Sequence, residues 1–179
     1  MKATGLLSLS LALVLPGALA ATGLAQDSHA SCSAHQAHDA HADHHAGVDE
    51  RGDHVMGFSH EKTTHHFGLT RDGGVIEVSA NDASDAESRD AIRGHLGHIA
   101  KMFSAGDFDA PMLIHDRVPP GVPTLQKKKA SIHWHFEETE RGGRIVAATS
   151  DAKALAAIHD FLRFQIDDHG TGDSKAISD

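Results

Sequence analysis

Histidine is the residue type in this chain with the greatest capacity for chemistry. Seventeen of the 179 residues are histidine, and six of them fall between residues 29 and 45 at roughly every third position. Imidazole suits copper, nickel and zinc, and copper(II) binds most tightly where sites are otherwise equal. We therefore predict that this segment binds a divalent transition metal ion, through His29, Cys32, His35, His38, His41, His44 and His45. The alternatives are low-complexity filler, which gives no reason to choose imidazole, and a charge brush that titrates near neutral pH.

A second group of imidazoles belongs to the part of the chain that should fold. Ile92, Leu96, Ile99 and Phe103 form a helical core stripe, and His95, His98 and Met102 form a stripe beside it. Strand alternation points His65 toward the helices, and leaves His66 and His135 on the open face. We predict a second metal site made of His65, His95, His98 and His115, with Met56 or Met102 as a soft axial ligand. The alternative is that these side chains are packing residues, and we expect His159 and His169 to be structural or exposed.

The segments around the folded part are predicted from composition. Residues 1–25 read as a signal peptide, with an apolar run from Leu6 to Leu15 and cleavage near Ala20 or Ala25. This predicts a periplasmic or secreted product without a membrane span. Residues 26–54 and 174–179 contain too little apolar surface to offset the entropy of ordering, so we expect both to be disordered. The formal net charge of −9 makes nucleic acid an unsuitable partner.

An internal repeat predicts the fold. The stretch from His66 to Ile76 aligns with that from His135 to Ile145, and each has a Gly-Gly pair between two strands. We expect the glycines to supply positive φ angles in a hairpin turn, with a helix after each hairpin. The domain at 55–173 then contains two ββα units, at 62–103 and 131–168, joined by a proline-containing linker at 104–130 that we expect to be extended. The predicted class is α+β, a two-layer sandwich with a four-stranded antiparallel sheet and two helices on one face.

Three segments resemble a family of small exported bacterial proteins. They are Met56–Phe67, which reads MGFSHEKTTHHF, Pro119–Pro123 and Phe161–Asp173. The resemblance covers about residues 55–173, and it implies that the Thr-Thr-His-His-Phe motif belongs to the purpose of the folded domain. Some members are labelled aspartate carbamoyltransferase, but the Ser-Thr-Arg-Thr phosphate-binding loop of that enzyme is absent here.

No catalytic motif stands out, so a binding function is favoured. The chain has no nucleophile elbow, no phosphate-binding glycine loop and no His-Glu-x-x-His helix. We predict a protein that binds, buffers or delivers copper, or else zinc or nickel, to an exported metalloprotein or transporter. Two alternatives stay open. One is an enzyme with haem or a metal on the helix-side histidines, and the other is an interaction module that forms a homodimer.

Overall fold

The computed structural model describes residues 44 and 46–178. The expected signal peptide and most of the histidine-rich segment lie outside the described residues, as do the candidate ligands His29, Cys32, His35, His38, His41 and His45. Within the described part of the chain, no helix is long and apolar enough to cross a membrane.

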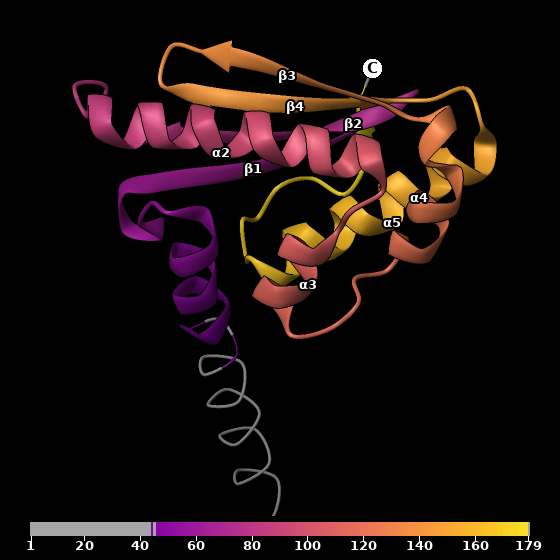
Figure 1. Cartoon of the computed structure of the whole chain (residues 1–179), viewed down its shortest axis with the longest axis horizontal. Coiled ribbons are helices and arrows are strands. Elements are labelled where there is room, and N and C mark those ends of the chain that lie inside the picture. Colours follow the sequence, from indigo (N-terminus) through magenta and orange to yellow (C-terminus); the bar gives the residue numbers. More distant parts are fainter. Residues whose placement is uncertain (1–43, 45, 179) are drawn as a thin grey trace, which may run out of the picture.

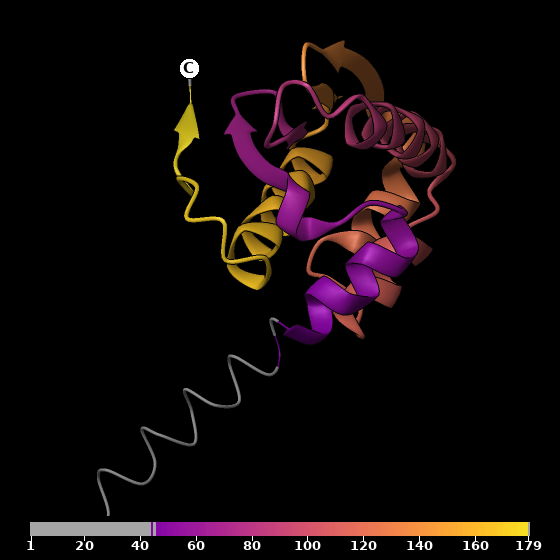
Figure 2. The same cartoon turned by 90° about the vertical axis from the view of Figure 1, so that its left-hand side faces the viewer.

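The described residues form an α+β fold with a mixed five-stranded sheet and five helices (Figure 1, Figure 2). The strand order is β3-β4-β2-β1-β5, in which β1 to β4 pair antiparallel and β5 pairs parallel with β1. The strands are β1 (Thr63–Thr70), β2 (Gly73–Ala80), β3 (His133–Thr139), β4 (Gly142–Ala148) and β5 (Ile177–Ser178). The predicted class is therefore right, whereas the expectation of a purely antiparallel four-stranded sheet is wrong.

The two glycine pairs start strands instead of forming turns. The turns of the two hairpins are Arg71-Asp72 and Glu140-Arg141, and none of the four glycines has a positive φ. A Cβ atom on Gly73 would lie 1.8 Å from the carbonyl oxygen of Ala147 on β4. A Cβ atom on Gly74 would lie 2.1 Å from Cδ1 of Leu162. These glycines thus permit close packing of β2 against β4 and against a helix, and the predicted reason for them was wrong.

Helices α2 (Ala86–Ala105) and α5 (Ala152–Asp168) cover one face of the sheet. Asp85 caps α2 by accepting a hydrogen bond from the Ser88 amide, and Asp151 caps α5. The predicted stripe of α2 is confirmed, because Ile92, Leu96, Ile99 and Phe103 are all buried. They pack with the inward side chains of β1, β2 and β4, while His66 and His135 on the other face are exposed, as expected.

The segment at 104–130 is helical where an extended linker was expected. It contains α3 (Asp109–His115) and α4 (Val122–Lys128). Pro111 and Pro123 both lie in the first turn of their helix, where the missing amide hydrogen has no partner to lose. Proline therefore starts these helices instead of preventing them.

Both ends of the domain extend further than expected. Residues 46–56 are helical, and Val48 is only 1% exposed, so the folded part begins before residue 55. Gly57 ends that helix with a φ of 77°. At the other end, β5 lies inside the stretch 174–179 that was expected to be disordered, and its pairing with β1 orders it.

Candidate functional site

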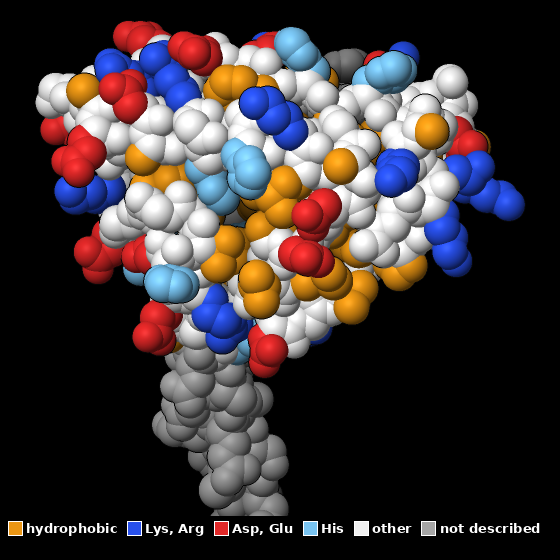
Figure 3. All heavy atoms as spheres, viewed as in Figure 1, with side chains coloured by type: hydrophobic (Ala, Val, Ile, Leu, Met, Phe, Trp, Pro, Cys, Tyr) orange, Lys and Arg blue, Asp and Glu red, His pale blue; other side chains and the backbone are white. Residues whose placement is uncertain are grey.

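A small pocket lies between β1, α2, α3 and α5, and its walls are mostly hydrophobic. Its volume is about 70 Å³, and four imidazoles and one thioether contribute to its lining. These are His65, His95, His115, His169 and Met56. Figure 3 shows histidine side chains beside a hollow below α2, with hydrophobic side chains around it. Residues far apart in the sequence therefore meet at one point of the fold.

His65 and His95 form one end of this group. Both rings contact Phe58, which is stacked on His65 at 6.2 Å and meets His95 edge-on at 5.6 Å between ring centroids. Burial, assisted by the nearby His95, lowers the pKa of His65 to about 4. Burial, assisted by His98, also lowers the pKa of His95 to about 4. Both imidazoles are therefore neutral at physiological pH, which is the form that binds metals.

His169 and His115 continue the row of rings. His169 stacks on His65, with centroids 5.6 Å apart and ring planes inclined by 5°, and it meets His115 edge-on at 5.0 Å. His115 ends α3 and is 2% exposed. The four imidazoles thus run from α2 across β1 and past the end of α5 to the end of α3.

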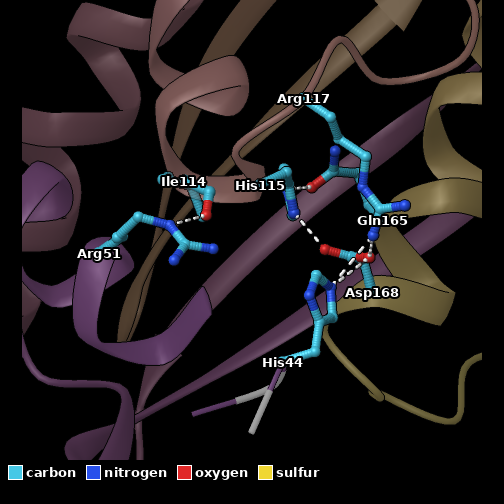
Figure 4. A network of polar contacts seen from close by, with 7 residues as sticks. All are labelled: His44, Arg51, Ile114, His115, Arg117, Gln165 and Asp168. Carbon is cyan, nitrogen blue, oxygen red and sulfur yellow. Dashed lines mark hydrogen bonds and ion pairs between the residues drawn. The ribbon is translucent and has the colours of Figure 1, made fainter. Parts of the chain in front are cut away.

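A polar network holds His115 in place (Figure 4). Its Nδ1 lies 2.6 Å from Oδ2 of Asp168, and its Nε2 lies 2.9 Å from Oε1 of Gln165. Oδ1 of Asp168 accepts a hydrogen bond from Arg117 at 2.6 Å and contacts Nε2 of His44 at 3.0 Å. His44, the only predicted ligand of the histidine-rich segment among the described residues, therefore lies on the carboxylate that orients His115.

The protonation of His115 follows from its surroundings. Burial lowers its pKa, and the opposing effect of Asp168 is smaller, so the ring is neutral. A neutral ring that donates from Nδ1 to a carboxylate must accept at Nε2. The amide nitrogen of Gln165 has no partner among the described residues. We infer that this amide turns by about 180° so that its nitrogen donates to His115.

The structure unites most of the predicted folded-domain ligands but not all of them. His65, His95, His115 and Met56 line the pocket. His98 is exposed and lines a separate groove beside Trp134 and His135, although it lies only about 60° around the helix from His95. Met102 packs partly buried against the core and does not line the pocket.

His169 was missed because it was expected to be structural or exposed. It caps the C-terminal end of α5, and only the packing of α5 against β1 carries it to His65. No periodicity in the sequence encodes that contact. The adjacent pair Asp168-His169 at a predicted helix end was the only available signal. His159 is structural as expected, since its buried Nε2 donates to the carbonyls of Thr70 and Gly73.

The pocket gathers donors without arranging them around a common point. Among residues 44 and 46–178, no three side chains of His, Cys, Asp or Glu are placed to hold one metal ion. The parallel stacking of His65 and His169 shows why, since stacked rings do not aim their nitrogens at a shared centre. A metal in this pocket would thus rely on fewer imidazoles, or on side-chain rotation.

Comparison with known proteins adds no assignment. No protein-family model, no curated protein and no solved structure matches the chain. The site must therefore be interpreted from its own chemistry.

Proposed function

We propose that this protein is exported and binds a transition metal ion, copper before zinc or nickel, which it buffers or delivers to an exported metalloprotein or transporter. The observation that supports this most strongly is the convergence of four imidazoles and Met56 on one apolar pocket. His66 and His135, on the other face of the sheet, are by contrast exposed to solvent. Neutral imidazole is a preferred ligand of copper, nickel and zinc.

The histidine-rich segment has a place in this proposal. His44 contacts Asp168, which in turn hydrogen-bonds His115 at the pocket. We propose that the segment captures the ion and that the pocket receives it. We also propose that a signal peptide exports the chain. The two hairpin–helix units arose, in the same proposal, by duplication of one unit.

The volume of the pocket favours an ion over a cofactor. Pockets for cofactor-sized ligands measure roughly 300–1,000 Å³, and one water needs roughly 10–15 Å³. A pocket of about 70 Å³ suits an ion with one or two small ligands better than it suits haem.

Equilibrium dialysis of the full chain against copper, zinc and nickel tests the proposal. In the double variant His65→Phe/His95→Phe, rings of similar size replace the two imidazoles. We expect it to lose one bound equivalent that the wild type holds. The matched control His66→Gln/His98→Gln changes the exposed neighbours and should keep every equivalent. Equal binding by both variants would exclude the pocket, and absence of binding by the wild type would refute the function.

A further inference from the structure

Resting on the proposed metal binding, we propose that the pocket selects monovalent copper, Cu(I), and holds it with His65, His95 and Met56. These three side chains line the same pocket. The proposal specifies the oxidation state of the ion and the ligands that determine it.

The imidazole nitrogens of His65 and His95 are not engaged in hydrogen bonds among the described residues. Within the described part of the chain, the rings of His65 and His95 make aromatic contacts, and no hydrogen bond to either ring is found. Both nitrogens of His115, by contrast, face Asp168 and Gln165. His65 and His95 can thus bind an ion without breaking a hydrogen bond of this network.

Met56 supplies the soft ligand of the proposed site. Its side chain folds back over Gly52, where a Cβ atom would lie 3.1 Å from Cε of Met56. Gly52 thereby leaves room for the thioether at the pocket. Thioether sulfur is a soft ligand that selects Cu(I), whereas zinc sites use four ligands drawn from thiolate, imidazole and carboxylate groups. Two imidazoles and one thioether complete a three-coordinate Cu(I) site, which needs no third His, Cys, Asp or Glu.

The uncharged lining of the pocket favours an ion of low charge. None of the described residues that line the pocket is Asp or Glu, and most of them are aliphatic or aromatic. Neutral ligands leave the charge of the ion uncompensated. Transferring an ion into a low-dielectric site costs a free energy that scales with the square of its charge, so a divalent ion costs about four times as much as a monovalent one. The nearby carboxylate of Asp168 is already engaged by Arg117 and His115.

The test compares two chemically identical substitutions, one inside the pocket and one outside it. Full-length protein with ascorbate, under nitrogen, competes for Cu(I) with the chelator bicinchoninate. Met56→Leu conserves the side-chain volume and replaces the thioether with a branched alkyl group, so the sulfur ligand is lost. We expect it to weaken the tightest Cu(I) equivalent at least tenfold. Met102→Leu, on α2 but outside the pocket lining, should change that affinity less than twofold. Ag(I), which has the same charge and is similarly soft, should bind the same pocket when metal-free protein is titrated without ascorbate, since ascorbate would reduce Ag(I) to the metal.

Three outcomes separate this inference from the proposed function. Equal affinity of the Met56→Leu and Met102→Leu variants for Cu(I) would overturn it, as would displacement of Cu(I) by equimolar Zn(II). In either case, a loss of bound equivalents in His65→Phe/His95→Phe would still support metal binding by the pocket. If that double variant keeps every equivalent of each ion tested, the pocket binds no metal and this inference fails, whereas the proposed function fails only if the wild type binds none of these ions.

Discussion

Nδ1 of the His115 imidazole lies 2.6 Å from Oδ2 of Asp168, and both side chains are buried. Burial alone would raise the pKa of Asp168, but hydrogen bonds from His44 and His115 outweigh it and hold the pKa below its usual value. An ionised Asp168 beside a neutral His115 fixes the proton of the imidazole on Nδ1. The same carboxylate joins α3, the end of α5 and the histidine-rich segment.

Replacing Asp168 with asparagine tests this network. The substitution Asp168→Asn removes the charge that accepts hydrogen bonds from His115 and Arg117, so we expect the free energy of unfolding to fall by about 1–3 kcal/mol. Urea unfolding in the presence of a chelator measures the change. Asp167→Asn is the matched control, because Asp167 is exposed and its ion pair with Lys175 lies at the surface. Equal losses in the two variants would contradict the role given to Asp168.

The stability of the metal-free protein should depend on pH through His65 and His95. Their pKa values are about 4 in the folded state and about 6.5 when unfolded. The unfolded chain therefore binds more protons between these values, and stability falls as pH decreases from 6.5 toward 4. Above pH 6.5 both groups are neutral in the folded and unfolded states, so their protonation does not change the free energy of unfolding. The expected loss is on the order of 2–3 kcal/mol for each group.

Substitutions of His65 and His95 test whether these two groups cause that pH dependence. Thermal unfolding between pH 4 and 7 should give a flatter stability profile for His65→Phe/His95→Phe than for the wild type. The exposed pair in His66→Gln/His98→Gln should flatten the profile much less, because burial is the largest cause of both pKa shifts. A double phenylalanine variant with the steep wild-type profile would mean that other groups cause the pH dependence.

The strand-starting glycines can be tested by single substitutions. Gly73→Ala places Cβ 1.8 Å from the Ala147 carbonyl oxygen, and the backbone atoms concerned cannot move without opening the sheet. We expect a loss of at least about 2 kcal/mol, or failure to fold. Gly68→Ala in the neighbouring strand meets nothing within 4 Å and should be tolerated. Similar stabilities of the two variants in urea unfolding would show that β2 and β4 are not packed this closely.

Sequence periodicity predicted the parts of the molecule that depend on local order. The alternation of side chains along β1 correctly predicted that His65 points toward the helices. The spacing of Ile92 and Phe103 correctly predicted the buried side of α2. The strand and the helix that bring His65 and His95 to the pocket were therefore identifiable from the sequence. The prediction of an extended linker was wrong because the effect of proline depends on its position in a helix. Pro111 and Pro123 both occupy the first turn of a helix.

The remaining features depend on tertiary contacts. Whether His95 or His98 enters the pocket is decided by the rotation of α2 over the sheet, which places His98 beside Trp134. His169 reaches His65 only because α5 packs against β1. The helix at 46–56 is short in apolar residues, and it is held by Val48 and by a hydrogen bond from Arg51 to the carbonyl of Ile114. No periodic pattern in the sequence predicts any of these contacts.

Diffraction from crystals soaked anaerobically with Cu(I) tests the central claim most directly. The account predicts an anomalous difference peak at the copper absorption edge inside the pocket. The peak should lie about 2.0–2.1 Å from one nitrogen each of His65 and His95, as is usual for a metal bound to imidazole. Copper found only on exposed imidazoles such as His66 or His135, with none in the pocket, would contradict it.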